Sequence, residues 1–285
     1  MKKIFETILL ISLLYSSVFS VRISVEISDN LLVNKRSIQE WAQEDYQRLK
    51  DLWKIDLSFP MHITVEKPSD KWGGESFLSV NSYNIVLSSS SERIRRTLTH
   101  EMMHLFNFEW DLKNNVKTPL WIVEGIACWW ESTINEQKRS ISPLIALNRD
   151  MLDVVNVKEY PHGEKLLAFY SAVEDLFLKI DKTIDLRKNL PVLFKVAKST
   201  GWERALSSFL KNDFSRFYER WKFEVLLISL LKLLYYNVPW LIVITLLVLI
   251  VFIRSRLHRN FNDDLSELEK IYGKNYWLNK DNEKF

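Results

Sequence analysis

The feature that most restricts how this chain can fold is an apolar segment near its C-terminal end, residues 233–253. This segment includes no Asp, Glu, Lys or Arg, and Asn237 and Thr245 are its most polar members. A core helix of a soluble protein normally has a polar face. An apolar helix of about 20 residues is instead long enough to cross a hydrocarbon core about 30 Å thick. We therefore expect a transmembrane helix at 233–253.

The residues beside this segment predict its orientation. Pro239 lies near its start, where a helix tolerates proline. Aromatic residues of the kind found at membrane interfaces also lie near the start: Tyr235, Tyr236 and Trp240. Three arginines follow its end: Arg254, Arg256 and Arg259. Because positive charge favours the cytoplasmic side, we expect a single-pass protein of the cell membrane with a cytoplasmic tail at 254–285.

The N-terminal end indicates export. Residues 1–20 have the pattern of a signal peptide, with two lysines, an apolar stretch, and small residues at Val18 and Ser20. An uncleaved anchor helix is the alternative, because Glu6 and Phe19 are unusual in a signal peptide. The two ends agree that residues 21–222 form an extracytoplasmic domain. The apolar segment 223–232 could lengthen the membrane helix, lie on the membrane surface or pack against the domain.

Charge and cysteine content argue against a nucleic-acid partner and against stabilisation by internal disulfides. The formal net charge is only +3, from 39 basic and 36 acidic residues, which gives no support for a nucleic-acid partner. Cys128 is the only cysteine, so the chain forms no internal disulfide. An exported domain of this kind depends on its core, a metal or its anchor for stability.

The expected order of elements is strands first and helices afterwards. Alternating or β-rich patterns predict strands at 21–27, 61–65 and 79–87. Periodic apolar residues predict helices at 37–52, 119–133, 164–180, 187–200 and 202–225. Ser89 and Glu92 form a capping box that predicts one more helix, with Ile94, Leu98, Met102 and Leu105 on its buried side. This order indicates an α+β fold, with a small N-terminal sheet followed by a helical half.

The string His100-Glu101-Met102-Met103-His104 is the most informative for chemistry. Side chains four residues apart lie one turn above each other on a helix, so both imidazoles can reach one tetrahedral zinc ion. Glu101 can then take a proton from a zinc-bound water, whose pKa falls to about 7. The alternative is two solvated histidines on an amphipathic helix.

Glu124 is the candidate third ligand. It is the only acid in the apolar segment 120–130, and a buried carboxylate without a partner is costly. Pro119 marks the start of its helix, and Gly125 would let this helix approach the preceding one closely. The alternative is a solvated acidic stripe that continues at Glu131.

Together the two motifs resemble the gluzincin metallopeptidases, and in particular the peptidase MA-like domains of bacterial envelope proteins. The segment 105–123 between His104 and Glu124 has the same length as in thermolysin-like enzymes, and residues 121–127 resemble the W-L-x-E-G-x-A string of aminopeptidase N-type and peptidase MA-like proteins. The resemblance implies a thermolysin-like catalytic domain with one Zn²⁺ per chain. In it, His100, His104 and Glu124 are metal ligands and Glu101 is the general base. It also implies that the strand before the metal helix offers an edge to an extended peptide, with an interior strand as the alternative.

The resemblance has limits. The G-x-M-E-N motif of aminopeptidases is absent, and Cys128 stands where thermolysin-like enzymes have an aspartate. The usual carboxylate partner of a zinc histidine must therefore come from elsewhere or be missing. We expect Cys128 to be a small buried residue rather than a ligand. The resemblance suggests Tyr170 as the donor to the reaction's oxyanion, with His162 as its rival.

These observations predict a membrane-anchored zinc metallopeptidase, with an endopeptidase as the favoured form, that hydrolyses polypeptide substrates outside the cytoplasm. Two alternatives stay open. One is an inactive, peptidase-like module for binding or assembly in the cell envelope, and the other is a zinc hydrolase that acts on a non-peptide bond. The sequence does not indicate the oligomeric state.

Overall fold

The computed structural model describes residues 21–28, 31, 33–67, 73–88, 90 and 93–272. The expected signal peptide at 1–20 and the capping pair Ser89 and Glu92 lie outside these residues. Contacts divide the chain into two compact units, one ending at Ser229 and the other beginning at Leu230. This division falls inside the segment 223–232.

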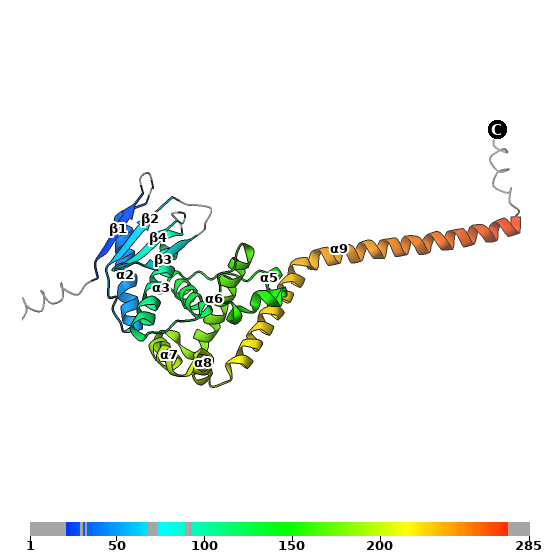
Figure 1. Cartoon of the computed structure of the whole chain (residues 1–285). Helices are drawn as coiled ribbons and strands as arrows, with labels where there is room; N and C mark the ends of the chain where they lie inside the picture. The colour runs from blue at the N-terminus through cyan, green and yellow to red at the C-terminus, as the bar shows by residue number, and fades with distance from the viewer. Residues whose placement is uncertain are drawn as a thin grey trace, which may run out of the picture. The chain divides into compact units, whose positions relative to one another are not determined.

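The first unit begins with a four-stranded mixed sheet, in the order β1-β2-β4-β3 (Figure 1). Its strands are β1 (Ile23–Ile27), β2 (Met61–Val65), β3 (Gly74–Leu78) and β4 (Tyr83–Leu87). The pairs β1–β2 and β2–β4 are parallel, whereas β3 and β4 are antiparallel. Alternate residues of β2 and β4 are buried on one face of the sheet, which packs against helices α2 (Lys35–Trp53) and α3 (Ile94–Asn114).

The strand expected at 79–87 is correct only in its second half. β4 begins at Tyr83, because Ser79 to Ser82 form the turn of a hairpin closed by a hydrogen bond from the Ser79 N–H to the Ser82 carbonyl. The sequence analysis missed the other arm of the hairpin, β3. β4 is also an interior strand, so the expectation that this strand provides the sheet edge is wrong. β3 is the edge strand instead.

The helical half follows the sheet, as expected for an α+β fold. Its longer helices are α3, α4 (Leu120–Asn135), α6 (Glu164–Ile184), α7 (Leu186–Thr200), α8 (Trp202–Leu210) and α9 (Phe214–Tyr272). Between α4 and α6 lie three short elements, namely α5 (Pro143–Leu147), η1 (Arg149–Leu152) and η2 (Val154–Asn156). α4 contacts both α3 and α6 and thereby forms the centre of this half. The expected buried face of α3 is confirmed, because Ile94, Leu98, Met102 and Leu105 are all buried.

The single helix expected at 202–225 is in fact two. α8 ends at Leu210, and Lys211 adopts a left-handed backbone conformation with φ of 52°. The Oγ of Ser207 accepts a hydrogen bond from the N–H of Phe214, where α9 begins. Asn212 and Asp213 are turn-forming residues, and they are the sequence signal for this break.

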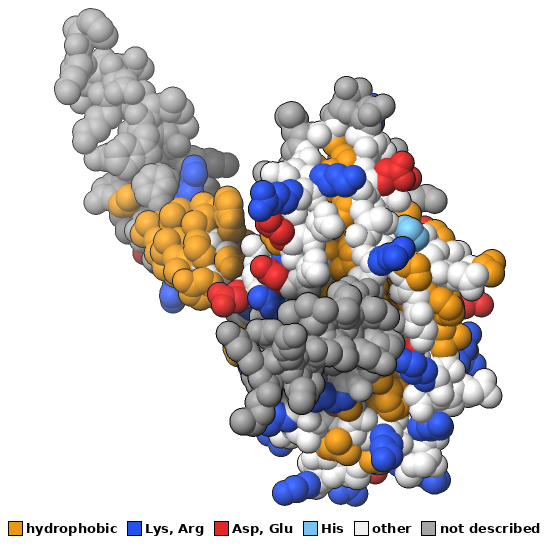
Figure 2. All heavy atoms as spheres, turned by 90° about the vertical axis from the view of Figure 1, so that its left-hand side faces the viewer, with side chains coloured by type: hydrophobic (Ala, Val, Ile, Leu, Met, Phe, Trp, Pro, Cys, Tyr) orange, Lys and Arg blue, Asp and Glu red, His pale blue; other side chains and the backbone are white. Residues whose placement is uncertain are grey.

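Among the described residues, one helix is long and apolar enough to cross a membrane. The stretch of α9 that meets this criterion is Phe214–Trp240, which includes the first residues of the expected segment 233–253. The hydrophobic side chains described between Leu233 and Ile253 are exposed, and Figure 2 shows exposed hydrophobic side chains gathered on α9. Pro239 lies in the interior of α9 rather than near its start, because the helix begins at Phe214.

Candidate metal centre

Helix α3 brings three residues of the predicted motif to one place. His100, Glu101 and His104 are all buried. The two imidazole rings meet edge to face with their centroids 4.7 Å apart, and their Nε2 atoms are 3.1 Å apart. The alternative of two solvated histidines is therefore wrong. Burial of both rings against each other requires a partner for their nitrogen atoms.

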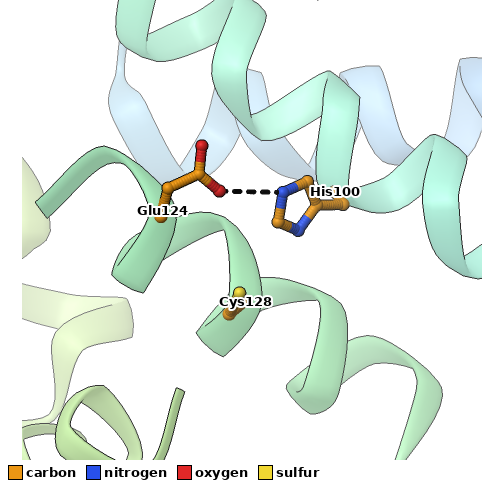
Figure 3. Close-up of side chains that lie close together, drawn as sticks. All are labelled: His100, Glu124 and Cys128. Carbon is orange, nitrogen blue, oxygen red and sulfur yellow. Dashed lines mark ion pairs between the residues drawn. The ribbon is translucent and has the colours of Figure 1, made fainter. Parts of the chain in front are cut away.

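Glu124 supplies that partner from α4. Its Oε2 lies 3.3 Å from His100 Nε2, and its Oε1 lies 3.5 Å from His104 Nε2. Figure 3 shows the Glu124 carboxylate pointing from α4 toward the His100 ring on α3. The side chain is 1% exposed, so Glu124 does not belong to a solvated stripe. Burial alone would raise the pKa of Glu124, but the charge of His104 and the close contacts with both histidines hold it well below its ordinary value.

The contacts among these three residues are close to the spacing of ligand atoms around a zinc ion. In a tetrahedral site with bonds of about 2.0–2.1 Å, neighbouring ligand atoms lie about 3.3 Å apart. The two Nε2 atoms are 3.1 Å apart, and the two oxygens of Glu124 lie 3.3 Å from His100 Nε2 and 3.5 Å from His104 Nε2. Glu124 Oε2 is also buried and has no hydrogen-bond partner among the described residues. Two histidines and one glutamate are a known ligand set for zinc sites that keep a fourth position open.

Cys128 lies one turn beyond Glu124 on α4 (Figure 3). Its sulfur and donor atoms of His100 and Glu124 all lie within 4.8 Å of one another, so these three residues form another possible ligand group. His104 also lies close to this group, with its Nε2 3.1 Å from His100 Nε2 and 3.5 Å from Glu124 Oε1. Burial also raises the pKa of the Cys128 thiol, which disfavours the thiolate that binds metals. As expected, Cys128 is fully buried.

Glu131 provides the carboxylate partner that the sequence left unassigned. Its Oε2 lies 3.0 Å from Nδ1 of His100, whereas Glu124 contacts the other ring nitrogen. Glu131 is only 2% exposed, so the alternative of a solvated acidic stripe that continues at Glu131 is wrong here too. It lies seven residues after Glu124, which places it two turns further along the same face of α4.

A buried network of charges holds Glu131. Arg96 donates from α3, and Arg139 Nη2 donates to both carboxylate oxygens of Glu131 at 2.6 and 2.8 Å. Arg139 Nη1 also donates to Glu174 on α6 at 2.7 Å. Ser132 Oγ donates to Glu174 at 2.6 Å. Burial would raise the pKa of Glu131, but His100, Arg139 and Arg96 lower it well below its ordinary value.

The two histidines differ in their supporting contacts. His104 Nδ1 is buried but has no hydrogen-bond partner among the described residues. Its ring instead stacks on Phe108, with centroids 6.3 Å apart. Of the two histidines, His100 is therefore the one whose Nδ1 contacts a carboxylate, that of Glu131, which fixes the orientation of the ring.

Glu101 lies beside the edge strand of the sheet. Ser76 Oγ on β3 donates to Glu101 Oε2 at 2.7 Å. A Cβ atom at Gly74 would come within 2.7 Å of Thr97 Cγ2 and 2.9 Å of Glu101 Cγ. The glycine therefore allows β3 to pass directly over the candidate general base.

Two tyrosines border the site. The ring of Tyr170 on α6 meets His100 edge to face at 6.0 Å, and the Arg139 guanidinium lies 5.8 Å from the centre of the tyrosine ring. Tyr160, which the sequence analysis did not select, donates a hydrogen bond of 2.5 Å to Glu124 Oε1. Burial and then the charge of Glu124 raise the pKa of both tyrosines, so both keep their hydroxyl protons at neutral pH. His162, the expected rival of Tyr170, is exposed in the loop before α6.

Gly125 has a different neighbour from the one expected. A Cβ atom at this position would lie 2.2 Å from two ring carbons of Phe177. Phe177 belongs to α6, so the glycine allows close packing of α4 on α6, and the expectation of close approach to the preceding helix is wrong.

Comparison with known proteins does not assign a family. No family model matches the chain, and a search of curated proteins finds no match. The geometry of the site and the resemblance of its motifs are therefore the basis for a functional proposal.

Proposed function

We propose that this protein is a zinc-dependent peptidase of the gluzincin type. One observation carries the proposal, namely the convergence of His100, His104 and Glu124: the two Nε2 atoms lie 3.1 Å apart, and each lies close to one oxygen of the Glu124 carboxylate, at 3.3 Å from Oε2 for His100 and 3.5 Å from Oε1 for His104. A zinc ion held by these residues would act as a Lewis acid that polarises a carbonyl group and acidifies a water molecule. The thermolysin-like character of the domain belongs to the same proposal.

Glu101 is the proposed general base. It follows His100 directly on α3, and Ser76 Oγ fixes one of its carboxylate oxygens. Glu101 takes a proton from the attacking water and gives it to the amine that leaves. General acid–base catalysis of this kind contributes a factor of about 10²–10⁴ to a rate.

The neighbouring strand supports a polypeptide substrate. Among the described residues, β3 pairs only with β4 and therefore lies at an edge of the sheet. Its Ser76 contacts Glu101, so a peptide that pairs with this edge would pass close to the general base. Strand addition recognises the backbone of an extended segment with little demand on its side chains. A small non-peptide substrate would not need this edge.

Tyr170 remains the proposed donor to the oxyanion, because it lies beside His100 and keeps its hydroxyl proton. Tyr160 has a different role in this proposal, since its hydroxyl already donates to the proposed ligand Glu124. We place the enzyme at the cell membrane through α9, with the peptidase domain outside and the C-terminal tail in the cytoplasm. The arginines after Ile253 support this orientation.

The first test is the zinc content of the purified full chain in detergent, with His104→Ala prepared in parallel. We expect about one zinc ion per wild-type chain, as for a single tetrahedral site, and loss of this zinc from the variant. The peptidase assay then compares wild type with Glu101→Gln, which should keep its zinc and lose activity. Glu203→Gln, at an exposed glutamate on α8, is the control.

Two outcomes would contradict the proposal. A folded wild-type protein that takes up no zinc would exclude the metal centre. A zinc-loaded protein that cleaves no unfolded polypeptide would favour the alternative of a binding or assembly module in the envelope.

A further inference from the structure

The last turns of α9 inside the first unit have two apolar faces. Trp221, Val225 and Ser229 follow each other at intervals of four residues, and all three are buried. On the opposite side of the same turns, Phe223 is 62% exposed and Leu227 is 45% exposed. A helix that packs one face against a soluble domain normally has polar residues on its outer face. These turns therefore require a second apolar partner.

Specific contacts prevent the outer face from turning inward. Trp221 Nε1 donates to Asp175 on α6 at 2.8 Å. Tyr218 donates to the carbonyl of Leu152 in η1 at 2.7 Å. Glu224 pairs with Lys179 of α6 and, at 3.0 Å, with Arg220. Rotation of α9 to bury Phe223 and Leu227 would break these contacts and expose Trp221.

The continuation of the same helix indicates the second partner. Ile228 precedes the uncharged segment that starts at Leu233 by only about 7.5 Å along a helix. The first unit ends at Ser229, only four residues before Leu233. The hydrocarbon core of a bilayer is about 30 Å thick, and the headgroup layers bring the total to about 40–45 Å. If 233–253 fills the core, residues 223–232 lie in the headgroup layer.

We infer that the outer face that includes Phe223 and Leu227 is a lipid-binding surface that seats the domain directly on the bilayer. The apolar side chains insert at the boundary between headgroups and acyl chains, where amphipathic helices bury such faces. The paired charges of Glu224 and Lys179 remain in the polar layer. A domain held in this way meets substrates at the membrane surface. The inference depends on α9 crossing the membrane but does not depend on zinc or peptidase activity.

The test measures the lipid contact of single introduced cysteines in the full chain. Phe223→Cys and Leu227→Cys are labelled with the fluorophore NBD and reconstituted into phosphatidylcholine vesicles, with or without nitroxide lipids. The nitroxide is placed at the headgroup or along the acyl chain. Val243→Cys reports the membrane core. Val192→Cys on α7 is the matched control, because Val192 is also apolar and 52% exposed. The parent chain shows whether the buried Cys128 reacts.

We expect headgroup nitroxides to quench the labels at 223 and 227, acyl-chain nitroxides to quench the label at 243, and neither to quench the label at 192. Labels at 223 and 227 that behave like the label at 192 would overturn the inference. So would labels that are shielded from both lipid nitroxides and aqueous iodide, because a protein partner would then cover this face. An unquenched label at 243 would overturn it as well, by showing that α9 is not in the bilayer, and would leave the zinc proposal untouched.

Discussion

Glu131 and Glu124 contact opposite nitrogens of the same histidine. The Glu131 carboxylate lies 3.0 Å from Nδ1 of His100, and the Glu124 carboxylate lies 3.3 Å from Nε2. When Nδ1 donates its proton to Glu131, the Nε2 lone pair points toward Glu124 and His104. The contact with Glu131 therefore prepares His100 to bind a metal, as carboxylate partners of zinc-bound histidines do.

The first prediction concerns this contact. Glu131→Gln keeps the size of the side chain but removes the charge that orients His100 and balances Arg96 and Arg139. We expect zinc affinity to fall by about 10- to 100-fold, the usual effect of losing such a partner. Competition with a chromogenic chelator measures this affinity. The exposed Glu159→Gln is the control, and equal affinities for both variants would contradict the orienting role of Glu131.

A second prediction concerns the packing of α4 on α6. Gly125→Ala would place its methyl group 2.2 Å from the Phe177 ring, so one of the helices must move. We expect a loss of about 1–3 kcal/mol in the free energy of unfolding, as is typical of overpacked cores. Thermal unfolding is measured for Gly125→Ala, for Phe177→Leu and for the double variant. The comparison separates the effect of each substitution from the effect of the clash between the two side chains. The double variant should lose less unfolding free energy than the two single variants together. If the losses are strictly additive, the clash with Phe177 is not what destabilises Gly125→Ala.

The sequence predicted the centre of the site better than its surroundings. Two histidines four residues apart, and one acid in an apolar helix, follow from helical periodicity alone. The role of Glu131 did not follow, because a glutamate seven residues after Glu124 fits a solvated face equally well. Whether Glu131 is solvated or buried depends on its contacts with Arg96, far earlier in the chain, and with Arg139, after the end of α4. Such contacts depend on the tertiary packing of α3 against α4, which periodicity does not describe.

The edge strand was missed for a related reason. Residues 74–78, Gly-Glu-Ser-Phe-Leu, show no clean alternation of apolar and polar residues, and none of their side chains is fully buried. Ser76 became important only because β3 passes over Glu101. Tyr160 was missed because it lies outside any helix or strand. The α+β class itself was predictable, since it requires only the order of strands and helices.

The third prediction is a dependence of stability on pH through Glu109. This buried carboxylate accepts hydrogen bonds from the Ser58 N–H at 3.0 Å, the Ser58 hydroxyl at 2.6 Å and the Tyr83 hydroxyl, and pairs with Lys113 at 2.7 Å. Burial would raise the pKa of Glu109, but these partners lower it below its ordinary value of 4.5. Its stabilising effect is therefore complete above pH 4.5 and is lost as the pH falls from there through the lowered pKa.

Urea unfolding of wild type and Glu109→Gln in detergent checks this effect. At pH 7 we expect the variant to be less stable by about 1.5–3 kcal/mol, as for hydrogen bonds to charged groups. The difference between the two proteins should shrink as the pH falls below the ordinary pKa of a glutamate. A difference that stays constant over this range would mean that the charge of Glu109 contributes nothing.

The fourth prediction separates the two tyrosines by different measurements. Tyr170→Phe and Tyr160→Phe each remove one hydroxyl group beside the candidate metal centre, so each is the other's matched control. Tyr170 is the proposed oxyanion donor, and its loss should lower kcat by about 10²–10³ with zinc affinity unchanged, as for other oxyanion donors. Tyr160 donates to Glu124 at 2.5 Å, so its loss should lower zinc affinity by about 10-fold, as for other contacts that orient a ligand. With zinc at saturating concentration, Tyr160→Phe should recover most of its activity.

The opposite result would exchange the two roles. If Tyr160→Phe keeps full zinc affinity and loses kcat, then Tyr160 is the oxyanion donor, and Tyr170 serves to pack against His100 and Arg139.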